Sequence, residues 1–177
     1  MQWTELLPIR MKESFAAADG LMKLVNDDEL DWKPATGMNW MTTGQLLKHI
    51  TCSCGFCCRG FDTGDWGMPE GESGSDSGEG HEDMLPPAEA LPTVSSVAEA
   101  RQQLADDRII AFAVVENAGE ERLNGEMSAA PWNPEDSRSL GQHCLNMTQH
   151  LDSHRHQLFY YLKLMGKDVN TMTLWGM

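Results

Sequence analysis

Apolar residues recur at helical spacing through most of the chain. Between residues 4 and 25 they fall three or four positions apart, at Leu7, Met11, Phe15, Ala18 and Leu21. Similar stripes mark residues 42–59, 95–119 and 139–165. No stretch alternates apolar and polar residues as a half-buried strand does. We therefore predict an all-α fold in which four long amphipathic helices form a four-helix bundle.

Capping and breaking residues place the ends of these helices. Thr42 or Thr43 can cap the second helix, and Ser96 with Glu99 three residues later fits a capping box at the third. The third helix is expected to stop at Gly119. Residues 120–138, which hold two prolines, are expected to be irregular.

A polar segment separates the second helix from the third. Residues 62–83 hold eight acidic residues and no Lys or Arg, and they are rich in Gly and Ser. High charge with low hydrophobicity predicts a long, flexible acidic insert. A solvated loop is one interpretation, and a cation-binding or lid loop is the other. We expect residues 1–177 to form a single domain that contains this insert.

Composition and charge narrow the classes of function. The chain has 177 residues, 41% of them hydrophobic, and a formal net charge of -14. Such an acidic protein repels phosphates, so we expect no nucleic-acid partner and no membrane partner. No apolar run approaches the length of a bilayer span, and the start of the chain lacks the pattern of a secretory signal. Four of the five cysteines crowd into residues 52–58, which does not suit a disulfide framework, so we expect a cytoplasmic protein.

The last helix carries the most informative polar residues. His150 and His154 are one turn apart on one face, where two imidazoles can chelate a divalent metal. His143, Gln157 and Tyr161 fall on the same line and are candidate pocket residues. His143 lies about 10 Å from His150 along the axis, too far to bind the same ion. The alternative is a hydrogen-bonded polar network within the core.

His49, on the second helix, is the candidate third ligand. A lone histidine among apolar neighbours is usually a core residue, but beside a facing histidine pair it completes a set of three. Three histidines with an open coordination position are typical of a catalytic metal site. Cys52, one turn from His49, is a candidate pocket residue or fourth ligand. If the helix is continuous, Cys52, Cys54, Cys57 and Cys58 do not converge on a single ion.

Three segments together resemble the DinB-like superfamily of metalloenzymes. They are Leu30-Asp-Trp-Lys-Pro34 with the following residues up to His49-Ile50, the approach to the third helix at residues 84–94, and His150-x3-His154-Arg-x-Gln157 with Tyr161 and Gly166. The last segment is the most specific. The resemblance spans nearly the whole chain in the expected order.

The resemblance implies an up-down-down-up bundle, often dimeric, that binds Zn, Ni, Fe or Mn through His49, His150 and His154. Related proteins include S-transferases and isomerases that use a low-molecular-weight thiol, and hydrolases. We therefore expect a metal-dependent transferase or hydrolase that acts on a small molecule, with a thiol as possible co-substrate, in a homodimer. Two alternatives stay open: a non-catalytic metal- or ligand-binding stress-response protein, and a structural bundle with satisfied core histidines.

Overall fold

Helices make up most of the computed structural model, which describes residues 1–66 and 87–177. The long helices are α1 (Trp3–Met22), α4 (Val97–Gly125) and α5 (Leu140–Leu164). The shorter helices are α2 (Thr43–Ile50), α3 (Gly55–Thr63) and α6 (Thr171–Leu174), with 3-10 turns η1 (Asp27–Glu29) and η3 (Ala88–Ala90). Strands β1 (Met127–Ala130) and β2 (Asn133–Ser139) form a small hairpin. The expected acidic insert, residues 62–83, lies mostly outside the described residues.

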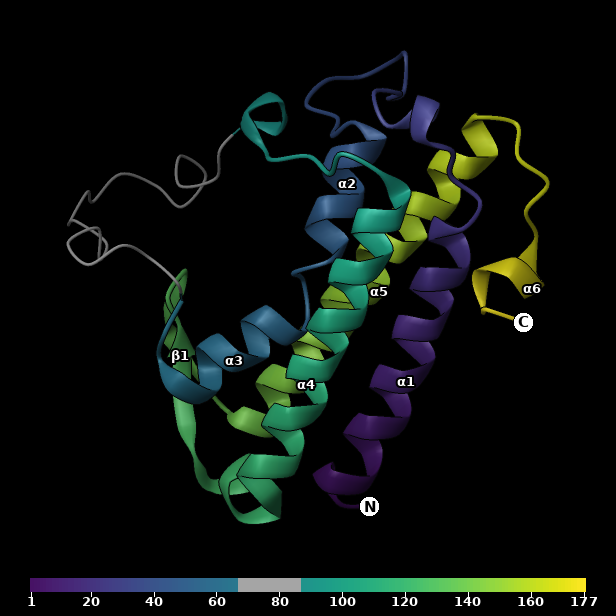
Figure 1. The fold of residues 1–177 in the computed structure, drawn as a ribbon. Helices are drawn as coiled ribbons and strands as arrows, with labels where there is room; N and C mark the ends of the chain where they lie inside the picture. The colour runs from purple at the N-terminus through teal and green to yellow at the C-terminus, as the bar shows by residue number, and fades with distance from the viewer. Residues whose placement is uncertain (67–86) are drawn as a thin grey trace.

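The long helices form a bundle in which α2 and α3 share the fourth position. α1 packs against α4 and α5, while α2 and α3 both pack against α5. In Figure 1, α1 and α5 run from the lower end to the upper end, and α2 and α4 run the opposite way. This is the expected up-down-down-up order. The core contains fully buried side chains from all these helices, among them Leu7, Leu46, Leu123 and Leu151.

The predicted second helix is wrong as a single element. It breaks into α2 and α3, and Figure 1 shows α3 turned away from α2 towards the hairpin. The Cys54 backbone at the break has φ -119° and ψ -72°, which departs from the regular α-helical values of about -63° and -42°. No proline marks this break, so the spacing of apolar residues alone predicted one continuous helix.

Two further expectations, both near residue 120, were also wrong. Gly119 does not end α4: its backbone (φ 60°, ψ 178°) makes a kink, and the helix continues to Gly125. The segment expected to be irregular contains β1 and β2, paired antiparallel. Because most of β2 is exposed and polar, its sequence does not alternate between apolar and polar residues. The strand is held by backbone hydrogen bonds to β1, which do not depend on apolar side chains.

Side chains from distant helices cap the ends of the bundle helices. The Glu120 carboxylate, just past the kink, accepts hydrogen bonds from the Trp3 and Thr4 amides at the start of α1 (3.1 and 3.0 Å). At α4, Ser96 Oγ accepts from the Glu99 amide as predicted (3.1 Å), whereas the Glu99 carboxylate binds Ser95 in place of the Ser96 amide. These caps satisfy amide groups that a helix cannot pair internally.

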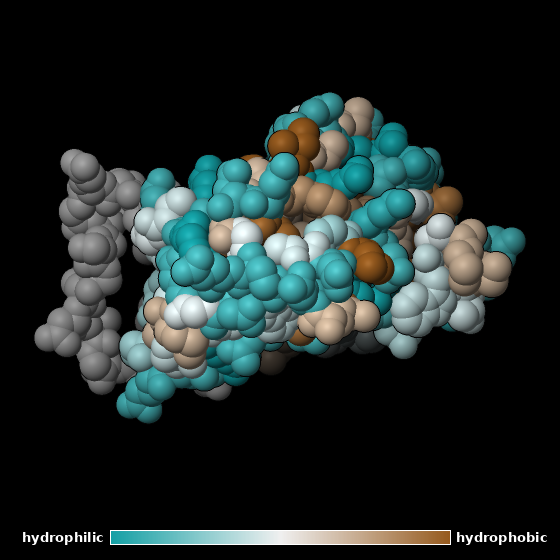
Figure 2. Space-filling model, turned by 90° about the horizontal axis from the view of Figure 1, so that it is seen from below, coloured by the Kyte–Doolittle hydropathy of each residue, from teal (hydrophilic) through white to brown (hydrophobic). Residues whose placement is uncertain are grey.

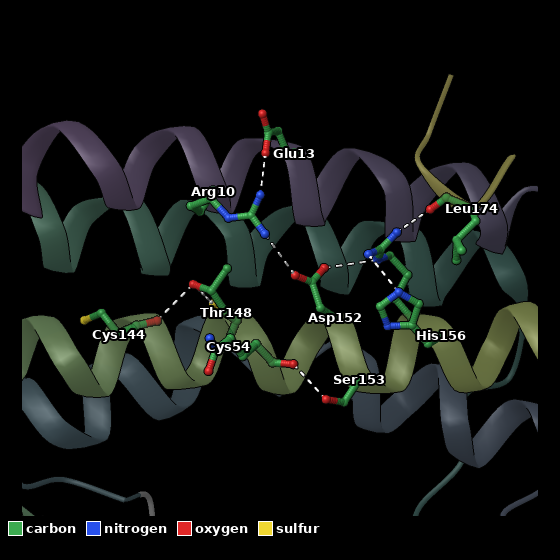
Figure 3. Close-up of polar contacts among 11 residues, drawn as sticks. Arg10, Glu13, Cys54, Cys144, Thr148, Asp152, Ser153, His156 and Leu174 are labelled. Carbon is green, nitrogen blue, oxygen red and sulfur yellow. Dashed lines mark hydrogen bonds and ion pairs between the residues drawn. The ribbon is translucent and has the colours of Figure 1, made fainter. Parts of the chain in front are cut away.

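The C-terminal residues pack against α1 and bind Arg155 of α5. Arg155 is buried, pairs with Asp152 (3.1 Å) and donates to the Leu174 carbonyl of α6. Asp152 also lies 3.8 Å from Arg10 of α1, and Figure 3 shows these groups in one chain of polar contacts. Asp152 therefore faces α1 and not α2.

One face of the molecule is mostly polar, in keeping with the net charge of the chain. Figure 2, seen from below, shows hydrophilic residues over most of that face, with hydrophobic residues visible between them near its middle. Among the helices of the described ranges, none is both long and apolar enough to cross a bilayer.

Candidate metal centre

Three histidines meet between α2 and α5. His49 lies in the last turn of α2, and His150 and His154 lie one turn apart on α5. The Nε2 atom of His49 is 3.3 Å from that of His150 and 3.1 Å from that of His154, and the last two are 2.9 Å apart. All three side chains are partly buried. The structure thus brings together the three histidines that the sequence singled out.

Local sequence holds α2 in the position that points His49 at α5. Thr42 caps the helix because its hydroxyl accepts a hydrogen bond from the Gln45 backbone amide, and the Gln45 side-chain oxygen accepts one from the Thr42 amide. Gln45 also donates to the backbone carbonyls of Ala88 and Leu91, which ties α2 to the chain before α4. Leu46 and Leu47 are fully buried and fix the inward face of the helix.

Hydrogen bonds at Nδ1 orient two of the three imidazoles. His150 Nδ1 lies 3.2 Å from the Ser53 carbonyl oxygen, and His154 Nδ1 lies 3.1 Å from Gln157 Oε1. Because both partners are acceptors, each Nδ1 carries the proton and donates it. In the neutral ring Nε2 is then an unprotonated acceptor. Each of these two rings therefore directs a bare lone pair at the other and at His49.

A divalent cation fits this arrangement. Lone pairs on two facing nitrogens repel, and a shared cation removes that conflict. Three nitrogens bonded to a tetrahedral ion at about 2.0–2.1 Å lie about 3.3 Å apart. The observed separations of 2.9–3.3 Å are close to this spacing. Within the described part of the chain, no carboxylate or thiol joins this group of potential ligands.

Burial favours the neutral form of all three imidazoles. Burial and the two neighbouring histidines lower the pKa of His49 to about 4. Burial likewise lowers the pKa of His150 and of His154, against the opposing effect of their hydrogen bonds to Ser53 and Gln157. Neutral imidazole is the form that binds metals. Three neutral ligands would leave the full charge of a divalent ion uncompensated.

Gln157 and Tyr161 lie beside the histidines in supporting positions. Gln157 accepts from His154, and its amide nitrogen is 3.5 Å from the Tyr161 hydroxyl. Tyr161 is buried, and its hydroxyl donates to the Met41 carbonyl at 2.9 Å. The rings of Trp32 and Trp40 pack edge-on against Tyr161.

His143 and Cys52 are placed away from the three ring nitrogens. His143 is buried near the hairpin, stacks on Phe61 with ring centroids 3.8 Å apart, and its Nε2 lies 2.8 Å from the Ser128 carbonyl. Cys52 lies in the turn after α2, its Sγ is 3.5 Å from the His49 carbonyl of that helix, and burial raises the pKa of the thiol. All five cysteines are free thiols, and Cys54, Cys58 and Cys144 are buried.

Sequence reasoning missed two groups near the histidines. The Ser53 carbonyl is a backbone group, so no residue type signals it. Asp107 is buried on α4 and binds the start of α3. A signal for Asp107 was available, because a charged residue lies within the apolar stripe of its helix, three residues after Leu104.

The chain is similar to known DinB proteins in sequence pattern and in fold. A solved structure of a DinB-like protein, YjoA, from Bacillus subtilis superposes with a TM-score of 0.63, covering 92% of this chain and 94% of that one at 15% identity. None of the curated proteins matches the sequence. The sequence profile of the DinB superfamily matches residues 10–158, which is most of the chain. The chain therefore belongs to the DinB superfamily.

Proposed function

We propose that His49, His150 and His154 hold a divalent metal ion and that the protein uses it to transform a small molecule. The observation that carries this proposal is the orientation of the ligands. His150 and His154 each donate Nδ1–H to a carbonyl-type oxygen, at 3.2 and 3.1 Å, and present the opposite nitrogen to His49. A hydrogen bond from the second ring nitrogen to such an acceptor is usual for metal-binding histidines.

The chemistry proposed is activation of a nucleophile. A bound divalent ion with an open position lowers the pKa of a ligated water or thiol, so that the deprotonated nucleophile exists near neutral pH. Gln157 holds the His154 proton at Nδ1, and the Ser53 carbonyl does the same for His150. Both contacts keep the ligand nitrogens free of protons.

The residues around the histidines favour a reaction that needs little general acid–base help. Asp152 faces α1, and the Tyr161 hydroxyl is engaged with the Met41 carbonyl. With no carboxylate in the ligand group of the described chain, the metal-bound nucleophile itself does most of the work. Thiol transfer to an electrophile, or hydrolysis, meets this condition, and membership of the DinB superfamily is compatible with both.

Metal analysis of the purified protein tests the proposal. We expect about one equivalent of divalent metal in the wild type and a large loss in His49→Ala, His150→Ala and His154→Ala. His156→Ala is the matched control, because His156 is two residues from His154 yet contacts Arg155 on another side of α5. Equal metal content in all five proteins would contradict the proposal.

Turnover separates catalysis from mere binding. A panel of low-molecular-weight thiols and electrophiles, assayed with and without EDTA, should reveal conjugation that the chelator abolishes and His156→Ala retains. Metal binding with no turnover in thiol-transfer or hydrolytic assays would favour a non-catalytic binding protein.

A further inference from the structure

The turn between α2 and α3 is held by a carboxylate from another helix. α3 begins at Gly55, and its N-cap residue, Cys54, makes no side-chain cap. The first amides of a helix need acceptors from elsewhere. Asp107 of α4 supplies them: Oδ2 accepts from the Gly55 amide at 2.8 Å and Oδ1 from the Phe56 amide at 2.7 Å.

The contact between this turn and α4 is close and specific. A Cβ atom at Gly55 would lie 1.9 Å from the Asp107 carbonyl oxygen, so only glycine allows this approach. Asp107 is 3% exposed, and burial raises its pKa to about 6 against the opposing effect of the amide donors. Burying a carboxylate is costly unless it has partners. An apolar residue at this position of α4 could not hold the turn.

The same turn provides the acceptor that orients His150. Ser53, two residues before Gly55, is buried, and its hydroxyl donates to the Ile50 carbonyl. Its own carbonyl accepts from His150 Nδ1 at 3.2 Å. A shift of the turn therefore moves this acceptor. His154 differs, because its acceptor, Gln157, lies on its own helix.

We propose that Asp107 is a positioning residue for His150: it fixes the α2–α3 turn so that the Ser53 carbonyl holds the imidazole with Nε2 towards the metal. The path runs from the Asp107 carboxylate through the Gly55 and Phe56 amides to the Ser53 carbonyl. This inference rests on the proposed metal function, which it deepens by adding a residue that touches none of the ligands.

The first test compares Asp107→Asn with Asp106→Asn. Asp106 is adjacent and exposed, and it binds only the Gln102 side chain among the described residues, so it is a matched control. Loss of a supporting contact behind a ligand typically weakens metal affinity by about 10–100-fold. We expect such a loss for Zn²⁺ in Asp107→Asn, together with a changed Co²⁺ absorption spectrum, and no change in Asp106→Asn. A lower melting temperature with unchanged affinity and spectrum would overturn the proposal.

A double-mutant comparison tests the route through His150. In a His150→Ala background, Asp107→Asn should cause no further loss of Zn²⁺ affinity, because the ring it positions is gone. In a Gln157→Leu background it should cause its full loss, because that substitution acts on His154. An equal loss in both backgrounds would overturn the route.

A metal-free readout separates failure of this inference from failure of the metal site. Nitrogen-15 NMR of the metal-free protein should show His150 as the Nδ1–H tautomer in the wild type and as a mixture in Asp107→Asn. An unchanged tautomer would overturn the positioning role even if no metal binds.

A wild-type measurement covers the case in which Asp107→Asn does not fold. Coupling between two sites is reciprocal, so Zn²⁺ should slow amide hydrogen exchange at Gly55 and Phe56. Unchanged exchange on saturation with Zn²⁺ would overturn the inference.

Discussion

Replacing Gln157 with leucine removes the acceptor behind His154 while keeping a side chain of similar size. In the structure His154 Nδ1 lies 3.1 Å from Gln157 Oε1. Without that acceptor the ring can adopt the Nε2–H tautomer, whose Nε2 cannot bind a metal. An unsatisfied, partly buried N–H costs about 1–3 kcal/mol. Supporting contacts of this kind change metal affinity by about 10–100-fold, which corresponds to about 1.4–2.7 kcal/mol.

Competition with a chromophoric chelator at pH 7.5 measures this effect as a Zn²⁺ dissociation constant. Gln149→Leu is the control, because Gln149 is exposed on the same helix. We expect Gln157→Leu to bind Zn²⁺ about 10–100-fold more weakly than the wild type and Gln149→Leu to match the wild type. Wild-type affinity in Gln157→Leu, or an equal loss in both variants, would refute the argument that Gln157 sets the tautomer of His154.

Three further outcomes follow from the described contacts. If the three imidazoles had ordinary pKa values, each would be half protonated at pH 6.5, and the Zn²⁺ affinity there would be about eightfold lower than at high pH. Because burial lowers the pKa of all three, we expect a Zn²⁺ titration at pH 6.5 to show a smaller loss of affinity. EDTA should lower the melting temperature of the metal-loaded protein, because a ligand at 100 times its Kd stabilises the fold by about 2.7 kcal/mol, and calorimetry showing no shift would count against a metal in the fold. Glu120→Ala should lower the midpoint of urea denaturation, because it leaves the Trp3 and Thr4 amides uncapped; an unchanged midpoint would show that this cap contributes nothing.

The helical spacing of apolar residues predicted most of the fold, and the spacing of the histidines predicted most of the candidate metal site. His150 and His154 share a face of any α-helix, so their pairing followed from the spacing alone. His49 was identified by its apolar neighbours and by the resemblance to the DinB-like superfamily, and the bundle places it against the pair. The all-α assignment held because the long helices bury continuous apolar faces.

The remaining features depend on backbone geometry that residue type does not report. The α2–α3 break arises where Asp107, distant in sequence, caps the turn. The orientation of His150 depends on the Ser53 carbonyl, which any residue would possess. The hairpin is a mostly polar ladder, and Gly119 kinks α4 where a stop was expected. Each of these is set by long-range packing rather than by local propensity.

X-ray absorption spectroscopy of the metal-loaded protein tests the central claim most directly, because it reports the atoms bound to the ion. We expect a first shell of nitrogen and oxygen at about 2.0–2.1 Å with imidazole scattering from three histidines. A sulfur ligand at about 2.3 Å, or imidazole scattering from fewer than three histidines, would contradict the claim that His49, His150 and His154 hold the ion.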